Sequence, residues 1–246
     1  MLGPMPPNRF LRLCVMALLL LGGASASAMP AQATEWQAVL VAGDNAEPVF
    51  DNAVTAVGQW LTGRGVPASG IHRLSASARG GDPTNEPASA RRVLDRIAAL
   101  QPGPGDGCFV FITSHGQRGQ GIWLAASGEF LEPAALARAL SAGCANAPTV
   151  VIVSSCYSGA FTAVRAPNRV IITAARADRP SFGCQADRTY TVFDECLLAA
   201  LPAAATWRAV RDANLDCVQR RERELGVLPS QPQAFFGKAV RKLAIR

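Results

Sequence analysis

Short runs of apolar, often β-branched residues recur along the chain and predict the strands of a sheet. Most of these runs are unbroken rather than alternating, which is typical of parallel strands that are covered on both faces. The predicted strands are residues 36–41, 71–74, 109–113, 150–153 and 170–173.

Between these runs, apolar residues recur at the spacing of an amphipathic helix. The predicted helices are residues 51–61, a segment that ends at Pro102, a segment that begins at Pro133, and residues 206–225. Residues 79–87 and 228–237 are rich in turn-forming residues and are predicted to be loops. Strands that alternate with helices form right-handed βαβ units, so we expect an α/β fold with a mostly parallel central sheet.

The first 33 residues have the pattern of a secretory signal peptide. Arg9 and Arg12 precede an apolar run at residues 13–21, which is shorter than the roughly 20 residues that a membrane-spanning helix needs. Small residues follow, and the pattern A-x-A occurs at residues 26–28 and 31–33. We expect cleavage after Ala33; cleavage after the earlier pattern and an uncleaved anchor are the alternatives. We therefore expect an exported domain at residues 34–246, periplasmic or extracellular, without stable membrane insertion after the signal is removed.

The composition is that of a globular protein with a sizeable core, since 49% of the 246 residues are hydrophobic and 17% are charged. The net charge is +6, but the basic residues are spread along the chain, and the dense run at 220–224 mixes Arg with Glu. We interpret that run as a solvated helix face and expect no nucleic-acid partner. The chain has only two histidines, His72 and His115, which excludes a three-His metal centre.

Six cysteines follow the predicted signal peptide, and export would place them in an oxidising compartment where disulfides form. All six could pair into three bridges. If one is a working thiol instead, at least one of the other five stays unpaired. Their number alone does not choose between these arrangements; they are Cys108, Cys144, Cys156, Cys184, Cys196 and Cys217.

Two reactive side chains follow the ends of predicted strands. His115 comes after the strand at 109–113, and Cys156 comes after the strand at 150–153. Ligands of parallel sheets bind beyond the carboxyl ends of the strands, and neighbouring strands lie about 5 Å apart, so the two side chains can share a cleft. A thiolate would attack a carbonyl carbon while the imidazole handles the proton of the leaving amine. We expect the backbone N–H groups of Gly116 and Cys156 to bind the oxyanion.

Plainer interpretations exist for each residue. Cys156 alone could be a core residue or half of a disulfide, and His115 alone could cap a strand; His72 is interpreted as structural. Two other classes of enzyme with a nucleophilic side chain, cysteine phosphatases and α/β-hydrolases, do not fit the sequence. A cysteine phosphatase needs an arginine six positions after the nucleophile, where this chain has Thr162, and an α/β-hydrolase elbow needs a later histidine, which is absent.

With these residues in place, the sequence resembles the legumain-like cysteine peptidases, relatives of caspases and gingipains, as an exported, bacterial-type member. The similarity runs from about Val39 to Leu198 and rests on four segments: VLVAGDN at 39–45, FITSHG at 111–116, VVIVSSCYSG at 150–159 and ITAARADRPSFGC at 172–184. It implies a caspase-like three-layer sandwich and a Cys–His dyad that needs no metal or organic cofactor. It also implies Cys156 as nucleophile, His115 as base, Gly116 in the oxyanion hole, and peptide or protein substrates.

The sequence departs from the family at the expected substrate pocket. Plant and animal members have a glutamate two residues before the nucleophile, where this chain has Ser154, and an early Arg-His pair, which roughly matches Asp51 and Asn52. Ser181 matches a pocket-lining serine of the family, so the resemblance implies Asp51, Ser154 and Ser181 as substrate-binding residues. The asparagine preference of eukaryotic members is therefore not carried over; an acidic Asp51 would favour Arg or Lys side chains, and its alternative role is at a helix N-cap.

The resemblance also suggests cysteine pairs. Cys108 and Cys144 each precede a strand that leads to a predicted catalytic residue, so a bridge between them is geometrically feasible. Cys184 and Cys196 flank a loop and are a second expected pair. A bridge that contained Cys156 would contradict the catalytic hypothesis.

The leading functional hypothesis is a secreted cysteine endopeptidase that works through an acyl-enzyme, with transpeptidation by the same intermediate left open. The alternatives are a cysteine hydrolase of small amides or esters, which a deep closed pocket would favour, and a non-catalytic binding protein that keeps the fold. The sequence leaves the natural substrate, zymogen processing and oligomeric state open.

Overall fold

A central sheet of seven strands organises the computed structural model, which describes residues 1–3, 35–78 and 85–245. The strand order is β10-β9-β8-β4-β1-β2-β3, with every pair parallel except β10 with β9. The strands are β1 (Trp36–Ala42), β2 (Ile71–Ser75), β3 (Glu86–Pro87), β4 (Gly107–Thr113), β8 (Thr149–Ser154), β9 (Arg169–Thr173) and β10 (Gln233–Phe236). The predicted signal peptide falls almost wholly outside the described residues.

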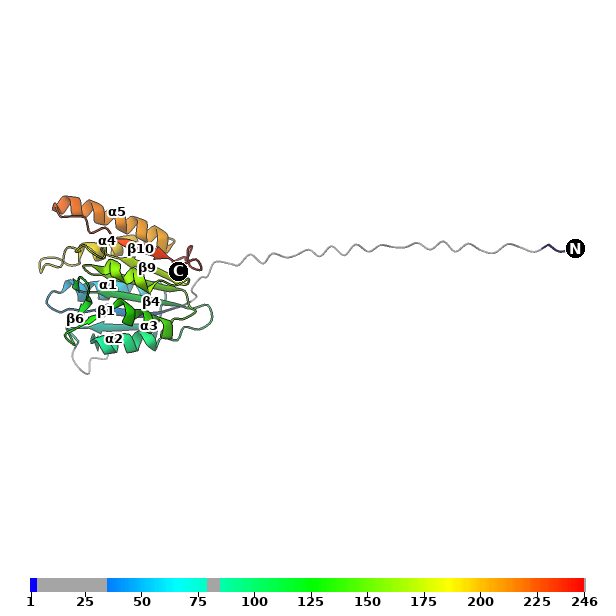
Figure 1. Cartoon of the computed structure of the whole chain (residues 1–246), viewed down its shortest axis with the longest axis horizontal. Helices are drawn as coiled ribbons and strands as arrows, with labels where there is room; N and C mark the ends of the chain where they lie inside the picture. Colours follow the sequence, from blue (N-terminus) through cyan, green and yellow to red (C-terminus); the bar gives the residue numbers. More distant parts are fainter. Residues whose placement is uncertain (4–34, 79–84, 246) are drawn as a thin grey trace.

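Helices cover both faces of this sheet, as Figure 1 shows with α5 on one side and α2 on the other. The α-helices are α1 (Val49–Gly63), α2 (Ala90–Ala98), α3 (Pro133–Gly143), α4 (Val192–Ala200) and α5 (Trp207–Leu225); the 3₁₀-helices are η1 (Ala68–Gly70) and η2 (Ser158–Val164). A small antiparallel sheet of β5 (Gly116–Gln117), β6 (Gly121–Leu124) and β7 (Glu129–Leu131) follows β4. Within the described residues, none of the helices combines the length and apolar character that a bilayer span requires.

Alternate residues of each strand point to opposite faces of the sheet and so build two separate cores. Leu40 and Phe111 point to the first face and pack with buried residues of α1, α4 and α5. Val41 and Ile112 point to the second face and pack with buried residues of α2, α3 and η2. The three-layer α/β arrangement predicted from the sequence is therefore confirmed. Below, the site is described relative to these two faces of the sheet.

The predicted strands and helices are present, but further elements were not predicted, among them α4 and β10. The segment of α4 is apolar on nearly all sides because it is buried, so it lacks the stripe that identifies a surface helix. Thr191 caps this helix, its hydroxyl accepting the backbone N–H of Asp194 at 3.1 Å. Strand β10 lies within the predicted loop at 228–237, and it forms by antiparallel pairing along the free edge of β9.

The structure contains two disulfides, one expected and one not. Cys108 and Cys144 are bridged as predicted, with their Cα atoms 6.2 Å apart. The expected pairing of Cys184 with Cys196 is wrong: Cys196 is bonded to Cys217 instead. The reason is that α4 packs directly against α5, which brings the Cα atoms of Cys196 and Cys217 to 5.6 Å. Among the described cysteines, Cys156 and Cys184 are free.

The register of the sheet aligns the carboxyl ends of its central strands. Thr113, the last residue of β4, lies opposite Ala42 of β1 and opposite Ser154, the last residue of β8. The segments that leave β4 and β8 therefore start from the same level of the sheet. This is the edge at which the sequence places the candidate chemistry.

Candidate active site

The segments that carry His115 and Cys156 are in direct contact at the carboxyl edge of the sheet. The backbone N–H of Ser114 donates to the carbonyl oxygen of Ser154 at 3.1 Å, which extends the pairing of β4 and β8 beyond their ends. A methyl group placed on Gly116 would lie 2.2 Å from the carbonyl oxygen of Cys156. Only a glycine fits at this approach, so Gly116 brings the backbone of one segment against the other.

Cys156 is half-buried and free, and its hydrogen bonds are made with the backbone of Ser181. The Ser181 N–H donates to Sγ at 3.2 Å, and the thiol donates to the Ser181 carbonyl oxygen at 3.4 Å. Burial raises the pKa of the Cys156 thiol, and the N–H groups of Ser181 and of Cys156 itself offset part of that rise. The resting side chain is therefore a thiol, and it needs a neighbouring base to become a nucleophile.

His115 is half-buried between α1 and β6. Its ring packs edge-on against Phe50, with ring centroids 5.2 Å apart and planes at 78°. Its carbonyl oxygen accepts the backbone N–H of Trp123 at 3.0 Å. The first contact is made by the imidazole ring, and the second fixes the backbone from which the ring projects. Phe50 belongs to this site, although its apolar character and its place one residue before the predicted helix gave no sign of that role.

The residues after Cys156 explain the pattern C-x-S-G. Tyr157 adopts the left-handed conformation, with φ of 60°, and its N–H donates to the carbonyl oxygen of Arg179 at 2.8 Å. The buried hydroxyl of Ser158 accepts the N–H of Ala175 at 3.1 Å, and Gly159 packs against the backbone of residues 175–177. The pattern thus fixes a tight turn against the segment that follows β9, and the strained residue is next to the candidate nucleophile.

The predicted substrate-binding residues lie in three different environments. Ser181 lies beside Sγ, as expected from the resemblance. Ser154 is only 2% exposed, and its hydroxyl lies 3.5 Å from that of Thr191, so the structure places it beneath the site rather than on the substrate surface. A strand-end residue alternates between faces, and Ser154 points to the α4 side.

Asp51 lies in the first turn of α1, near the carboxyl end of β2. The helix N-cap is Pro48, so the alternative interpretation of Asp51 as a capping residue is wrong. Its two carboxylate oxygens accept the hydroxyls of Ser75 and Ser77, each at 2.6 Å. These serines hold Asp51 in place, and the adjacent Phe50 links it to His115.

A buried carboxyl group lies under the same edge of the sheet and was not identified from the sequence. Asp194 of α4 has no exposed surface, and its Oδ2 accepts the hydroxyl of Thr113 at 2.8 Å. Thr113 and Asp194 are 81 residues apart in the chain. No local pattern joins them, because their contact depends on how α4 packs on the sheet.

An open hollow of about 440 Å³ adjoins the candidate pair on the second face of the sheet, between η2, α3 and the turn joining β5 to β6. Gln117 and Tyr157, which line it, directly follow Gly116 and Cys156 in the chain. Ser181 and Asp51 belong to segments that pack on the first face. The candidate pair therefore lies between two flanking surfaces, one on each side of the sheet.

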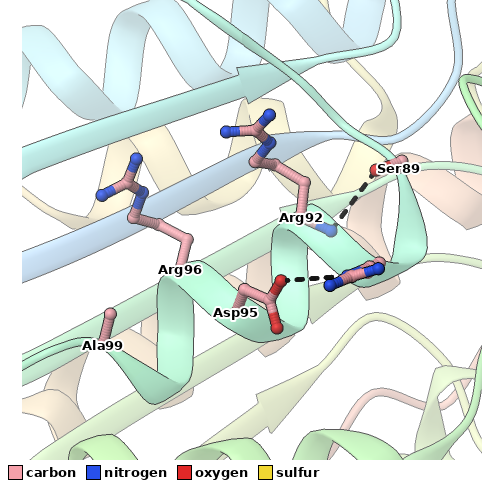
Figure 2. Close-up of a pocket in the computed structure, with 6 residues that line it drawn as sticks. Ser89, Arg92, Asp95, Arg96 and Ala99 are labelled. Atoms are coloured by element: carbon pink, nitrogen blue, oxygen red, sulfur yellow. Dashed lines mark hydrogen bonds and ion pairs between the residues drawn. The ribbon is translucent and has the colours of Figure 1, made fainter.

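A second hollow lies on α2 and is lined by that helix and its two capping residues. Figure 2 shows Arg92 and Arg96 projecting from the same side of the helix. Glu86 pairs with both guanidinium groups, at 3.4 Å and 2.7 Å, and compensates part of their charge. Within the residues that the structure describes, no group of three or more His, Cys, Asp or Glu side chains could hold a metal ion.

Comparisons with known proteins identify the family of the chain and the fold that it shares with solved structures. The profile of the peptidase C13 family matches residues 89–212, a segment that contains His115, Cys156 and Ser181 but not Asp51. Among curated proteins, none matches the chain.

Solved structures with the same architecture include caspase-1 from Spodoptera frugiperda, with 12% sequence identity and a TM-score of 0.60 over 82% of this chain and 86% of that one. A protein from Geobacter sulfurreducens has 15% identity and a TM-score of 0.59, over 86% of this chain and 100% of that one. At such identities the likeness shows the fold, and it confirms the caspase-like sandwich predicted from the sequence.

Proposed function

The chain belongs to the peptidase C13 family, and from that premise we propose that it is an exported endopeptidase with Cys156 as nucleophile and His115 as general base. The family and the caspase-like fold identify a cysteine-type peptidase that acts on protein substrates. The observation that carries the assignment of residues is the close approach of Gly116 to the Cys156 carbonyl, which brings the two segments together at one edge of the sheet.

The proposed reaction begins with transfer of the Cys156 thiol proton to the His115 imidazole. The thiolate then attacks the scissile carbonyl carbon, and the resulting oxyanion accepts hydrogen bonds from the N–H groups of Gly116 and Cys156. The imidazolium gives its proton to the leaving amine nitrogen, and the C–N bond breaks to leave a thioester acyl-enzyme. A water molecule, deprotonated by His115, hydrolyses the thioester and restores the thiol.

The thiol must exchange its hydrogen bond before this reaction starts. In the structure it donates to the Ser181 carbonyl oxygen, which holds the proton away from the imidazole. Catalytic hydrogen bonds are commonly loose in an unliganded enzyme and tighten when substrate binds. We propose that a substrate chain seated at Ser181 releases the thiol toward His115.

The open surface beside the pair supports a peptide substrate over a small amide. Gln117, Gly119 and Gln120 line the hollow and are exposed, so it is not a closed pocket. We propose that the residue before the scissile bond lies on the Ser181 side and that the leaving-group chain crosses toward the hollow. An extended chain fits between these two surfaces, whereas a small amide would leave both uncovered.

The direct test is covalent trapping of the nucleophile. We expect a peptidyl acyloxymethyl ketone to label purified residues 34–246 on Cys156, and prior labelling to stop cleavage of an internally quenched peptide library. Mass mapping of the adduct distinguishes Cys156 from Cys184, the other free cysteine of the described chain. Labelling of Cys184 alone, with no peptide cleaved, would contradict the proposal.

Export is part of the same proposal and is supported by the signal-like pattern at residues 1–33 and by the two disulfides. Expression of the full chain in a bacterium with an active export system is expected to yield protein outside the cytoplasm that begins at residue 34. N-terminal sequencing of the recovered protein checks this. Recovery of full-length chain from the cytoplasm, with Met1 retained, would count against export.

Asp51, which follows Phe50 in the first turn of α1, leads to a prediction about specificity. We expect Asp51→Asn to lower kcat/KM for peptides with Arg at the cleavage site by about tenfold, because a charge-assisted hydrogen bond is lost. Peptides with Asn at that position should be cleaved equally by both enzymes. Fluorogenic Arg and Asn peptides, assayed side by side, measure the ratio. Asp95→Asn, an exposed acid on α2, is the matched control; an equal loss on both peptides would instead assign Asp51 to holding Ser75 and Ser77.

A further inference from the structure

The carboxyl group of Asp194 occupies a place at which the ends of two strands meet. It is fully buried, and its Oδ2 accepts the hydroxyl of Thr113 at 2.8 Å. Thr113 is the last residue of β4 and lies opposite Ser154, the last residue of β8. His115 follows Thr113 by two residues, and Cys156 follows Ser154 by two residues. Asp194 therefore contacts β4 at its last residue, at the level of the sheet where the segments that carry His115 and Cys156 both begin.

Two further hydroxyl groups lie close to this carboxyl group. Its Oδ1 is buried and has no hydrogen-bond partner among the described residues, and the hydroxyls of Ser154 and Thr191 lower the pKa of Asp194. These two hydroxyls are themselves 3.5 Å apart. The carboxyl group of Asp194 thus lies among three hydroxyl groups, from β4, β8 and the N-terminus of α4, and accepts a hydrogen bond from the first of them.

Burial of the Asp194 carboxylate lowers the stability of the folded chain. Burial raises the pKa of Asp194 to about 6, and the three hydroxyls oppose that rise. None of the ion pairs found among the described residues includes Asp194; the adjacent Glu195 pairs with Arg188 and Arg221 instead. From α5, the side chain that reaches this turn is the neutral Asn214, which donates to the carbonyl of Phe193. A buried carboxylate without a cation destabilises a protein at neutral pH, so the presence of Asp194 here points to a role other than stability.

We propose that Asp194 is a positioning residue of this peptidase. Its carboxylate keeps the ends of β4 and β8 in register and thereby sets the distance between the His115 imidazole and the Cys156 thiol. The roles of His115 and Cys156 rest on the proposed function. Because Asp194 is fully buried, this role is exerted through Thr113 and Ser154 rather than by contact with the substrate. Small displacements at such a pair are costly, since a shift of about 1 Å can reduce a rate about a hundredfold.

Protonation of the Asp194 carboxylate turns one of its oxygens from a hydrogen-bond acceptor into a donor. The carboxylate only accepts, whereas the carboxylic acid must donate from one oxygen, so the hydroxyls of Thr113, Ser154 and Thr191 have to reorient. The groups that face Asp194 from β4, β8 and α4 are these hydroxyls, and they carry no charge of their own. One of the protons whose uptake inactivates the enzyme on the acid side is therefore expected to bind Asp194.

The test compares Asp194→Asn with wild type over the pH range from 4.5 to 8.5. The amide has the same shape and never ionises, so we expect kcat at pH 7.5 to fall about tenfold with KM nearly unchanged. On the acid side, log(kcat/KM) of the wild type should fall with a slope approaching two, and that of the variant with a slope approaching one. The melting temperature of the variant at pH 7.5 should be no lower than that of wild type, because the ionisation cost is removed.

Thr113→Val provides a second variant that keeps the acid and removes its hydroxyl donor. Its loss of kcat should match that of Asp194→Asn, and the double variant should lose no more than either single one. Thr149→Val removes a buried threonine hydroxyl at the opposite end of β8 and should retain wild-type kcat. Wild-type kcat and an unchanged acid slope in Asp194→Asn, or an equal loss in Thr149→Val, would overturn the proposal.

A readout without substrate separates this proposal from the proposed function. The rate at which iodoacetamide alkylates Cys156, followed by mass spectrometry of the Cys156 peptide, reports on the thiol even if no peptide is cleaved. We expect this rate to fall more steeply on the acid side in wild type than in Asp194→Asn, which lacks the step that Asp194 contributes near pH 6. The same pH profile in both proteins would overturn the positioning role, whatever the outcome of the cleavage assays.

Discussion

Replacement of Cys156 by alanine is expected to reduce kcat/KM for peptide cleavage at least about a thousandfold, because the substitution removes the atom that forms the acyl-enzyme. His115→Ala is expected to cause a loss of similar size, since burial keeps Cys156 a thiol at rest and no other base is then positioned to take its proton. Residues that act as one unit lose activity together, so the double variant should be no worse than either single one. Steady-state assays on one internally quenched peptide measure all three.

The chain supplies matched controls for both residues. Cys184 is the other free cysteine among the described residues, and His72 is the other histidine of the sequence. His72 lies on β2, where burial and Arg96 lower its pKa and Glu86 opposes that change. Cys184→Ala and His72→Gln should keep kcat/KM within about threefold of wild type. Full activity in Cys156→Ala, or an equal loss in Cys184→Ala, would contradict the assignment of the nucleophile.

The strands and the candidate pair could be predicted from the sequence because both depend on local pattern. Runs such as 109–113 and 150–153 are apolar and β-branched over the whole length of a buried parallel strand. His115 and Cys156 stand directly after those runs, and the edge of a parallel sheet is where ligands bind. The register that aligns Thr113 with Ser154 then brings the following segments together.

What the sequence did not predict depends on contacts between distant segments. The helix α4 has polar side chains only in its first turn and lacks a polar stripe along its length, so it was not recognised. Both the Cys196–Cys217 bridge and the place of Asp194 depend on its packing. Ser154 was assigned to substrate because the family has a functional residue there, but the last residue of a strand points to one face, and that face is covered here. The two serines that hold Asp51 also come from a strand and a turn more than 20 residues away.

Membership of the family does not determine which side chains of the substrate this chain would bind. The family profile begins at residue 89, so Asp51 is outside the matched segment. Its carboxylate is already bonded to Ser75 and Ser77, and each of these hydroxyls satisfies part of its capacity to accept. A carboxylate can accept about four hydrogen bonds, which leaves room for a guanidinium group from a substrate. The Asp51→Asn comparison decides between a recognition role and a purely structural one.

Gly116→Ala is expected to reduce kcat/KM at least about a hundredfold without removing any catalytic side chain. The new methyl group would lie 2.2 Å from the Cys156 carbonyl oxygen and 3.2 Å from its carbonyl carbon. Because this neighbour is backbone, it cannot rotate away, and the segment after β4 must move from the segment after β8. That movement carries the imidazole away from the thiol and the Gly116 N–H away from the oxyanion, each of which costs about two orders of magnitude in comparable enzymes.

Gly63→Ala is the matched control for this prediction, because a methyl group at Gly63 meets nothing within 4 Å. It should retain wild-type kcat/KM. The melting temperature and the rate of Cys156 alkylation separate two causes of any loss in Gly116→Ala: a misfolded chain melts earlier, whereas a displaced His115 slows alkylation in a chain that still melts cooperatively. Nearly full activity in Gly116→Ala would mean that the two segments can separate without consequence. In that case the contact between Gly116 and Cys156 would not be what aligns the catalytic pair.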